Sequence, residues 1–263
     1  MSIATLLSTA DVPMSRQRLL NAYRTEAKYA FLRFLRSPAF AIPTLLFPVL
    51  FYLLIGFLFG AFRSTNPDAP TYLFCGFATM AAITPGMFGF GIGLALEREQ
   101  GLFLLKRALP LPPLAALSAS VAMSVLSTTI AVILLAVTAL AIGTVNLTTL
   151  QVLAVIPIVA LGAIPFSALG LLIGSIVSGR AAPAIVNVVY LVLLYFSGLF
   201  IPLPQAIQAI VLGSPAFYLH QLALNGAGAP NFIIGGAWAH VAILTAMAAV
   251  CITLATRRLA RVG

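Results

Sequence analysis

The charged side chains that could take part in chemistry gather in one short stretch, residues 97–113, which reads Glu-Arg-Glu-Gln-Gly-Leu-Phe-Leu-Leu-Lys-Arg-Ala-Leu-Pro-Leu-Pro-Pro. It opens with Glu97 and Glu99, and Lys106 and Arg107 follow in its middle. Acidic residues early and basic residues late complement the dipole of a short helix, which the prolines would then end. The pattern predicts a short charged helix in a cytosolic loop between two spans, and the residues alone are equally explained by a solvated helix in a loop that sets the topology.

Other groups capable of catalysis or ligation are few. A phosphate-binding P-loop needs a glycine directly before its lysine, but the two lysines follow Ala27 and Leu105. His220 and His240 are isolated, so no metal site is predicted. No Asp or Glu follows Glu99, which argues against a carboxylate-coupled carrier and against acid–base catalysis in the membrane. The chain is therefore expected to be no enzyme by itself and to hold no cofactor of its own.

The composition requires lipid contact over much of the surface. Of the 263 residues, 62% are hydrophobic and 7% are charged, whereas soluble domains carry roughly 25% charged residues. Uninterrupted apolar runs favour helices over the alternating segments of a barrel. The expectation is one all-α membrane domain, residues 1–263, with six transmembrane helices at 39–62, 72–96, 114–142, 152–177, 183–201 and 233–256.

The charges also predict the orientation. All 14 Lys and Arg except Arg63 fall in the N-terminal segment, in the loops after spans 2 and 4, or in the C-terminal tail. Cytoplasmic loops collect Lys and Arg, so the net charge of +9 indicates topology and no nucleic-acid partner. With an even number of spans, both termini are predicted to be cytoplasmic in a multi-pass protein of the cell membrane, such as the bacterial inner membrane.

Residues 15–37 form a separate amphipathic element. A helical wheel gathers an apolar face (Leu20, Tyr23, Ala27, Phe31, Phe34) opposite a basic one (Arg18, Lys28, Arg33, Arg36). Such a helix is predicted to lie on the anionic inner leaflet, with a solvated cytosolic helix as the alternative.

Polar residues within the spans are candidates for a substrate path. They lie on one face of span 3 and in span 5, at Ser120, Ser124, Thr128, Asn187 and Tyr190. A path of this kind is uncharged and suits an amphipathic molecule, but ordinary hydrogen bonding between helices explains the same residues. Helix packing is predicted for three glycine pairs four residues apart, at Gly56 and Gly60, Gly89 and Gly93, and Gly170 and Gly174.

The 97–113 stretch resembles the signature of type-2 permease subunits of ATP-binding-cassette (ABC) exporters. In that family, an acidic-basic-acidic-basic-Gly run leads a cytosolic helix that ends in proline. The matching positions here are Glu97, Arg98, Glu99, Gln100, Gly101 and Pro110, with departures at Leu102 and Leu104. The resemblance implies that 97–109 is a coupling helix, which docks into a separate ATPase through Glu97, Arg98, Glu99, Gly101, Lys106 and Arg107.

A second resemblance lies between spans 5 and 6. Ser197-Gly198-Leu199-Phe200-Ile201-Pro202 is similar to the family's Ser-Gly-x-Phe-x-Pro run, and Pro215 and His220 follow at about the family's distance. In the family, this region dips back into the outer leaflet, which implies a re-entrant hairpin at 202–232. A plain amphipathic outer loop is the alternative.

Taken together, the resemblance implies the permease of an ATP-driven exporter. It implies a homodimer bound to two copies of an ATP-binding subunit, which holds ATP and Mg²⁺. The substrate would be an amphipathic or hydrophobic molecule of the drug (multidrug), antibiotic, lipid or glycan classes. Two other functions remain open on the residues alone: an ATP-independent channel or carrier, and a structural membrane anchor.

Overall fold

The structure, a computed structural model, describes residues 16–58, 68–102, 115–145, 147–200 and 211–262. These residues contain helices and turns but no strand, in agreement with the predicted all-α class. In chain order the helices are α2 (Arg16–Leu35), α3 (Pro38–Leu58), α4 (Ala69–Thr84), the π-helix η3 (Pro85–Ile92), α5 (Gly93–Glu99), α7 (Ala115–Ile142), α8 (Thr149–Ile176), α9 (Ala182–Tyr195), α11 (Pro215–Ala227), the short 3-10 helix η5 (Pro230–Phe232) and α12 (Ala237–Val262).

Five helical segments among the described residues are long and apolar enough to cross a membrane. They correspond to the predicted spans 1 to 4 and 6, and are Pro38–Leu58, Ala69–Glu99, Leu117–Ile142, Thr149–Ile176 and Ala237–Leu259. The protein is therefore a multi-pass membrane protein.

The fifth predicted span, 183–201, differs from the structure. Its helix, α9, has 14 residues, which at about 1.5 Å per residue falls short of a hydrocarbon core about 30 Å thick. The helix ends at Tyr195, and Gly198 shortly after it has a φ of 65°, a left-handed conformation that favours glycine and does not continue a helix.

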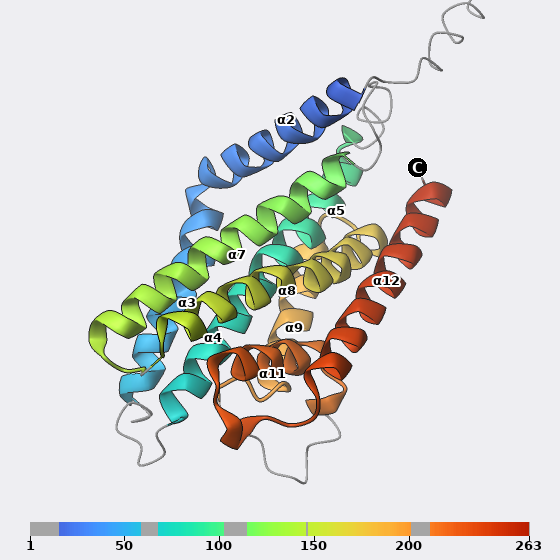
Figure 1. Cartoon of the computed structure of the whole chain (residues 1–263). Coiled ribbons are helices and arrows are strands. Elements are labelled where there is room, and N and C mark those ends of the chain that lie inside the picture. The colour runs from blue at the N-terminus through green and yellow to red at the C-terminus, as the bar shows by residue number, and fades with distance from the viewer. Residues whose placement is uncertain (1–15, 59–67, 103–114, 146, 201–210, 263) are drawn as a thin grey trace, which may run out of the picture.

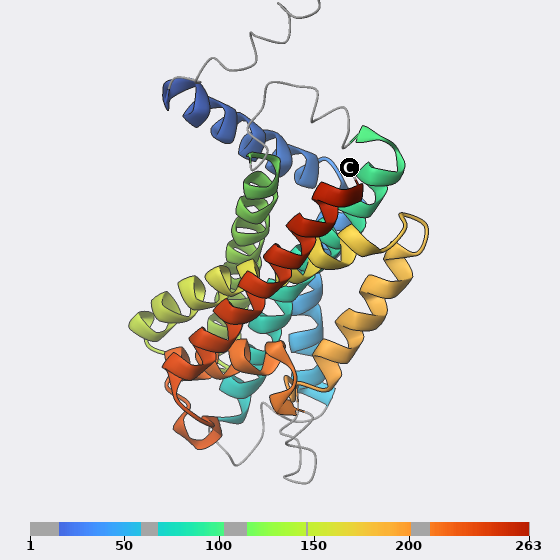
Figure 2. The same ribbon diagram turned by 90° about the vertical axis from the view of Figure 1, so that its right-hand side faces the viewer.

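The bundle has one distinctly basic end. Figure 1 and Figure 2 both show the start of α2, the end of α5, the start of α7 and the end of α12 at this end. Every described Lys and Arg belongs to α2, the turn after it, α5, the α8–α9 loop or the last turns of α12. The opposite end carries the start of α4 together with α11 and η5. We use the terms basic end and opposite end for these two regions below.

Helix α2 lies across the basic end and packs along α7. Phe34 of its predicted apolar face is buried, and Phe31 is half-buried. Leu20 of that face is exposed, as are Lys28 and Arg33 of the basic face. The amphipathic pattern is thus used to seat the C-terminal half of α2 on the bundle.

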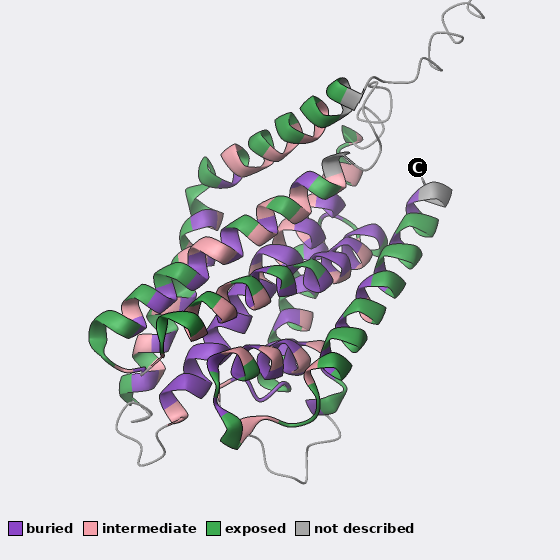
Figure 3. Cartoon of the chain, viewed as in Figure 1, coloured by how far each residue is buried: buried purple, intermediate pink, exposed green. Residues whose placement is uncertain are grey.

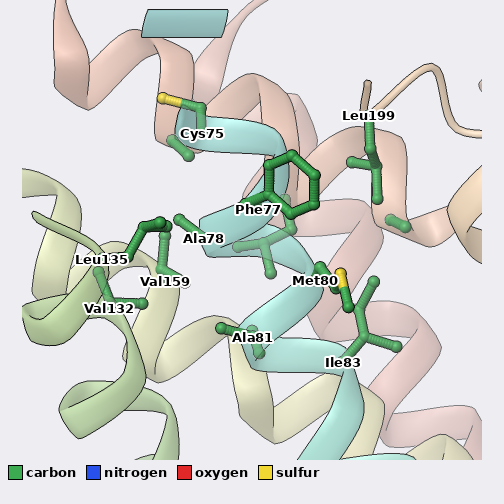
Figure 4. Packing of buried hydrophobic residues seen from close by; sticks show 14 of the residues in the cluster. Cys75, Phe77, Ala78, Met80, Ala81, Ile83, Val132, Leu135, Val159 and Leu199 are labelled. Atoms are coloured by element: carbon green, nitrogen blue, oxygen red, sulfur yellow. The ribbon is translucent and has the colours of Figure 1, made fainter. Parts of the chain in front are cut away.

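Helix α4 is the centre of the core. Figure 3 shows it buried along its length, and every residue from Pro70 to Ile83 is buried. Small residues on α4 permit this close contact. In Figure 4, Ala78 and Ala81 lie toward Val132 of α7 and Val159 of α8. Because lipid is as apolar as these side chains, close van der Waals packing is what holds such helices together.

The long helix from Ala69 to Glu99 contains the π-helical segment η3 in the half nearer the basic end. Backbone-to-backbone packing joins η3 to α8. A Cβ atom added to Gly170 would lie 2.5 Å from the Gly86 carbonyl oxygen, and one added to Gly174 would lie 2.7 Å from that of Gly91. Only glycine allows this approach.

The spacing of these contacts explains one wrong prediction. Gly170 and Gly174 are confirmed as a packing pair, four residues apart on an α-helix. On η3, however, the contacting glycines are Gly86 and Gly91, five residues apart, because π-helical hydrogen bonds join residues five apart. The predicted partner Gly93 has no atom within 4 Å of an added Cβ.

Candidate functional site

Three consecutive charged side chains end helix α5 at the basic end, and each contacts a different part of the bundle. Successive helical residues point about 100° apart, so neighbours on the chain reach different partners. The first is Glu97, whose Oε1 accepts a hydrogen bond from Arg33 Nη1 of α2 at 3.1 Å. This contact ties the amphipathic helix to the end of the second span.

Arg98 reaches the end of α8. Its Nη1 donates a hydrogen bond to the Gly174 carbonyl at 2.8 Å. Nε of Arg258, from α12, donates to the next carbonyl, that of Ser175, at 3.1 Å. The last carbonyls of a helix have no partner within it and carry partial negative charge, so cationic groups stabilise them. The two arginines therefore fasten α5 and α12 to one turn of α8.

Glu99 contacts the loop between α8 and α9. Its Oε1 lies 3.6 Å from Arg180 Nε, and its carboxylate occupies the space that a side chain at Gly179 would need. Arg180 is 93% exposed and Arg33 is 68% exposed, so each ion pair contributes at most about 1 kcal/mol to stability. These pairs position the end of α5 more than they stabilise the fold.

The chain turns directly after these charges. Gly101 has a φ of 72°, a left-handed conformation that is common for a glycine just after a helix. Its N–H donates to the Arg98 carbonyl and so caps the end of α5. Lys106 and Arg107, the other predicted coupling residues, lie outside the described residues.

The residues of the Ser-Gly-x-Phe-x-Pro resemblance meet at the opposite end, around the first turns of α4. The Ser197 hydroxyl bonds with the Leu193 carbonyl and with Ser214, and the Tyr72 hydroxyl donates to the Gly198 carbonyl. The ring of Phe200 lies 4.8 Å from that of Phe77, centroid to centroid.

α4 lacks a side chain where this segment crosses it. Gly76 lies directly beneath the Leu199 backbone, in space that a Cβ atom would fill. Pro215 opens α11, and Pro202 lies outside the described residues.

His220 of α11 completes this cluster. Its Nε2 lies 3.3 Å from the Tyr72 carbonyl oxygen, and the two rings meet edge to face at 4.6 Å. Burial lowers the pKa of His220 to about 4, while the hydrogen bond to Tyr72 acts in the other direction. The imidazole is neutral at pH 7 and donates its Nε2 proton to the carbonyl. It acts as a buried structural hydrogen-bond donor.

The predicted substrate-path residues of span 3 do not form one open strip. Ser120 is half-buried, and Ser124 is fully buried with no hydrogen-bond partner. Thr128 is buried and donates to the Ala81 carbonyl at 3.2 Å. Pro85, four residues after Ala81, has no N–H to offer that carbonyl, so the hydroxyl from α7 takes its place.

The two path residues of α9 face in different directions. Tyr190 is buried, and its hydroxyl oxygen lies 3.2 Å from Oγ1 of Thr84. Its ring packs edge to face against that of Phe88. Asn187 is exposed among the apolar residues Val188 and Leu191. The structure therefore does not bring Asn187 together with the polar face of α7.

Sequence reasoning did not select Arg180, Arg258 or Tyr72 as site residues. No spacing rule relates Arg258 to Ser175, which lies 83 positions earlier. The membrane topology already explains a basic residue near the end of a span. The sequence therefore does not indicate that Arg258 also donates a hydrogen bond to the end of α8.

The fold and this site define a polytopic membrane subunit of the permease type. Residues 21–226 match the ABC-2 type transporter family, and the chain belongs to that family. It is also 27% identical over 240 residues to a Bacillus subtilis (strain 168) protein named "Putative transport permease YvfS", across 86% of this chain and 92% of that protein. Members of the family are transmembrane subunits, generally not catalytic themselves, that usually work with an ATP-binding subunit.

Proposed function

We propose that the chain is the permease of an ATP-driven exporter that moves an amphipathic or hydrophobic molecule out of the cytoplasm. One observation carries the proposal. Glu97, Arg98 and Glu99 join α2, α8 and the α8–α9 loop at the start of the segment that resembles a coupling helix, 97–109. A displacement of that segment by a bound ATPase would reach three parts of the bundle at once.

The mechanism follows from these connections. Closure of two ATPase subunits on ATP moves residues 97–109. Arg98 transfers the movement to the last turn of α8, and Arg258 passes it on to α12. The basic end faces the cytoplasm, because Lys and Arg are retained on that side. ATP and Mg²⁺ stay on the partner subunits.

The homodimer is supported by the exposed amide of Asn187. An amide facing hydrocarbon lacks hydrogen-bond partners, and such groups usually face another helix or a path. A second copy placed against α9 would give this amide a polar neighbour. The path between two copies would then be uncharged, which suits an amphipathic substrate.

A six-span topology completes the proposal. Helix α9 and the residues that follow it form the fifth crossing, and the segment around α11 forms an outer re-entrant hairpin before the sixth. The short length of α9 supports this arrangement, because a helix of 14 residues needs additional chain to reach the far surface.

The first test is purification of the tagged chain in mild detergent, with identification of its partner by mass spectrometry. A stoichiometric partner with a Walker A motif is expected, and a well-folded preparation without one would favour an autonomous channel or carrier. The second test uses the complex in nanodiscs. The variant Glu97→Lys/Glu99→Lys should insert normally but lose most permease-dependent ATP hydrolysis.

A charge swap separates coupling from general damage. Arg33→Glu combined with Glu97→Arg rebuilds the ion pair with reversed polarity. The combined variant should recover part of the permease-dependent ATP hydrolysis that Glu97→Arg alone loses. Glu26→Lys on α2 reverses a charge outside this site and should have no effect. Normal permease-dependent ATP hydrolysis in the Glu97→Lys/Glu99→Lys variant would contradict the mechanism.

A further inference from the structure

A small cavity, partly open to the surface, lies at the opposite end of the bundle, away from every charge contact described above. Its volume is about 160 Å³, close to the roughly 150 Å³ of an engineered cavity that binds benzene. Helix α4, the segment after α9, α11 and the residues around η5 surround it. Its walls are mainly apolar and aromatic, and include Tyr72, Val211, Phe217, Phe232 and Ile234.

One buried polar group faces this cavity with hydrogen-bond donors to spare. Gln221 lines the cavity and is 2% exposed. Its Oε1 accepts a hydrogen bond from the Ile234 N–H at 2.8 Å, which fixes the amide orientation with Nε2 as the donor end. Among the described residues, no acceptor receives a hydrogen bond from that Nε2 group. These N–H groups are accessible from the cavity, so a ligand acceptor placed there would gain a hydrogen bond from Gln221.

The other polar groups on the walls are already engaged. The Tyr72 hydroxyl donates to the Gly198 carbonyl, and Ser197 bonds with Leu193 and Ser214. Asn231, at the exposed edge of the cavity, donates from Nδ2 to Asp68 Oδ2 at 2.6 Å. No wall residue carries a formal charge at pH 7. The cavity thus offers aromatic and aliphatic contact together with one pair of amide donors.

We propose that this cavity is a binding site for a small uncharged molecule, or the uncharged end of a larger one, that is largely apolar and carries a carbonyl or ether oxygen. The oxygen accepts from Gln221 Nε2, and the apolar part packs between Tyr72, Phe217 and Phe232. A charged headgroup or a sugar is disfavoured, because the walls could not satisfy its polar groups.

The test uses the chain alone in nanodiscs, so it does not depend on the exporter mechanism or on an ATPase. Binding of 4-fluoroacetophenone is followed by ¹⁹F NMR line broadening, with empty nanodiscs as the baseline for lipid partition. The comparison probe is 4-fluoro-α-methylstyrene, which has the same shape with a CH₂ group in place of the oxygen. Saturable binding is expected, with the ketone roughly five- to tenfold tighter, the usual effect of one net hydrogen bond.

Two variants locate the site. Val211→Phe fills the cavity and should weaken both probes at least tenfold, whereas the same change at Val241, which is exposed on α12, should leave binding unchanged. Gln221→Met keeps the volume but removes the donors, so the ketone should lose its advantage. If Val211→Phe fails to fold, Ile234→Phe fills the cavity from another wall.

Three outcomes would overturn the proposal: broadening equal to that in empty nanodiscs, unchanged binding in a correctly folded cavity-filled variant, or equal affinity of the two probes for the unmodified chain. A failure to find an ATPase partner would overturn the exporter proposal but leave this result untouched.

Discussion

Replacing Gly86 by alanine tests the π-helical contact between η3 and α8. The added Cβ would lie 2.7 Å from the Ser167 backbone nitrogen and 2.9 Å from the Phe166 carbonyl carbon. Ordinary contact begins near 3.4 Å, so the two helices must separate by roughly 0.7 Å at this point. Both obstacles are backbone atoms, and no rotamer change can relieve the overlap.

The cost follows from the loss of close packing. Overpacking in a well-packed interior costs about 1–3 kcal/mol, and the contact between Gly170 and the Gly86 carbonyl would be lost as well. Gly93→Ala is the matched control, since an added Cβ there has no atom within 4 Å. That change should stabilise the helix by about 0.5–1 kcal/mol, because alanine loses less backbone entropy than glycine.

The measurement is unfolding of the purified chain in mixed micelles with increasing SDS. Gly86→Ala should unfold at a lower SDS fraction than the unmodified chain, and Gly93→Ala at an equal or higher one. Gly89→Ala should lie between them, since its Cβ meets only the mobile end of Met123 at 3.3 Å. If Gly93→Ala proved as damaging as Gly86→Ala, the contacting face would follow an α-helical register and the argument for η3 would fail.

Two further predictions use the same unfolding assay. Thr128→Val removes the donor to the Ala81 carbonyl and should cost about 1–2 kcal/mol, whereas Thr138→Val should be nearly neutral, because that exposed hydroxyl bonds only within its own helix. His220 has a pKa of about 4 when folded and about 6.5 when unfolded. The unfolded chain therefore binds more protons between these values, and His220 should contribute roughly 3 kcal/mol above pH 6.5 that is lost as the pH falls to 4. His220→Gln should flatten this part of the profile, and an unchanged profile would contradict the assignment.

The sequence predicted most of the fold because the membrane imposes strong rules. Spans must be long, apolar and helical, and positive loops collect on one side. Spans 1 to 4 and 6 are confirmed within a few residues on this basis, and the basic end was visible as a charge asymmetry. The sequence did not predict the short length of α9. The apolar run continues past Tyr195, and hydrophobicity alone does not detect the helix-ending effect of Gly198.

Long-range partners were beyond sequence reasoning for a physical reason. A π-helical segment changes the residue spacing along one helix face, so the four-residue spacing expected from the sequence selected Gly89 and Gly93 instead of Gly86 and Gly91. The sequence resemblance assigned Glu97 and Glu99 to contact with an ATPase. In the structure they pair with Arg33 and Arg180 of the same chain, and whether they also touch an ATPase stays a prediction.

The two motif regions, far apart in sequence, are joined by one element. The helix from Ala69 to Glu99 holds the Ser197–Phe200 segment against its first turns through Tyr72 and Gly76, and its last turn carries the charged side chains of the basic end. Between them lies η3, where the helix is locked to α8 by glycine contacts at Gly86 and Gly91. A movement that travels along this helix from one region to the other has to pass through this locked segment. Helix α9 (Ala182–Tyr195) also runs between the Arg180 loop and Ser197. The glycine variants therefore examine one of the helical connections between the two regions, and their effect on coupling is as informative as their effect on stability.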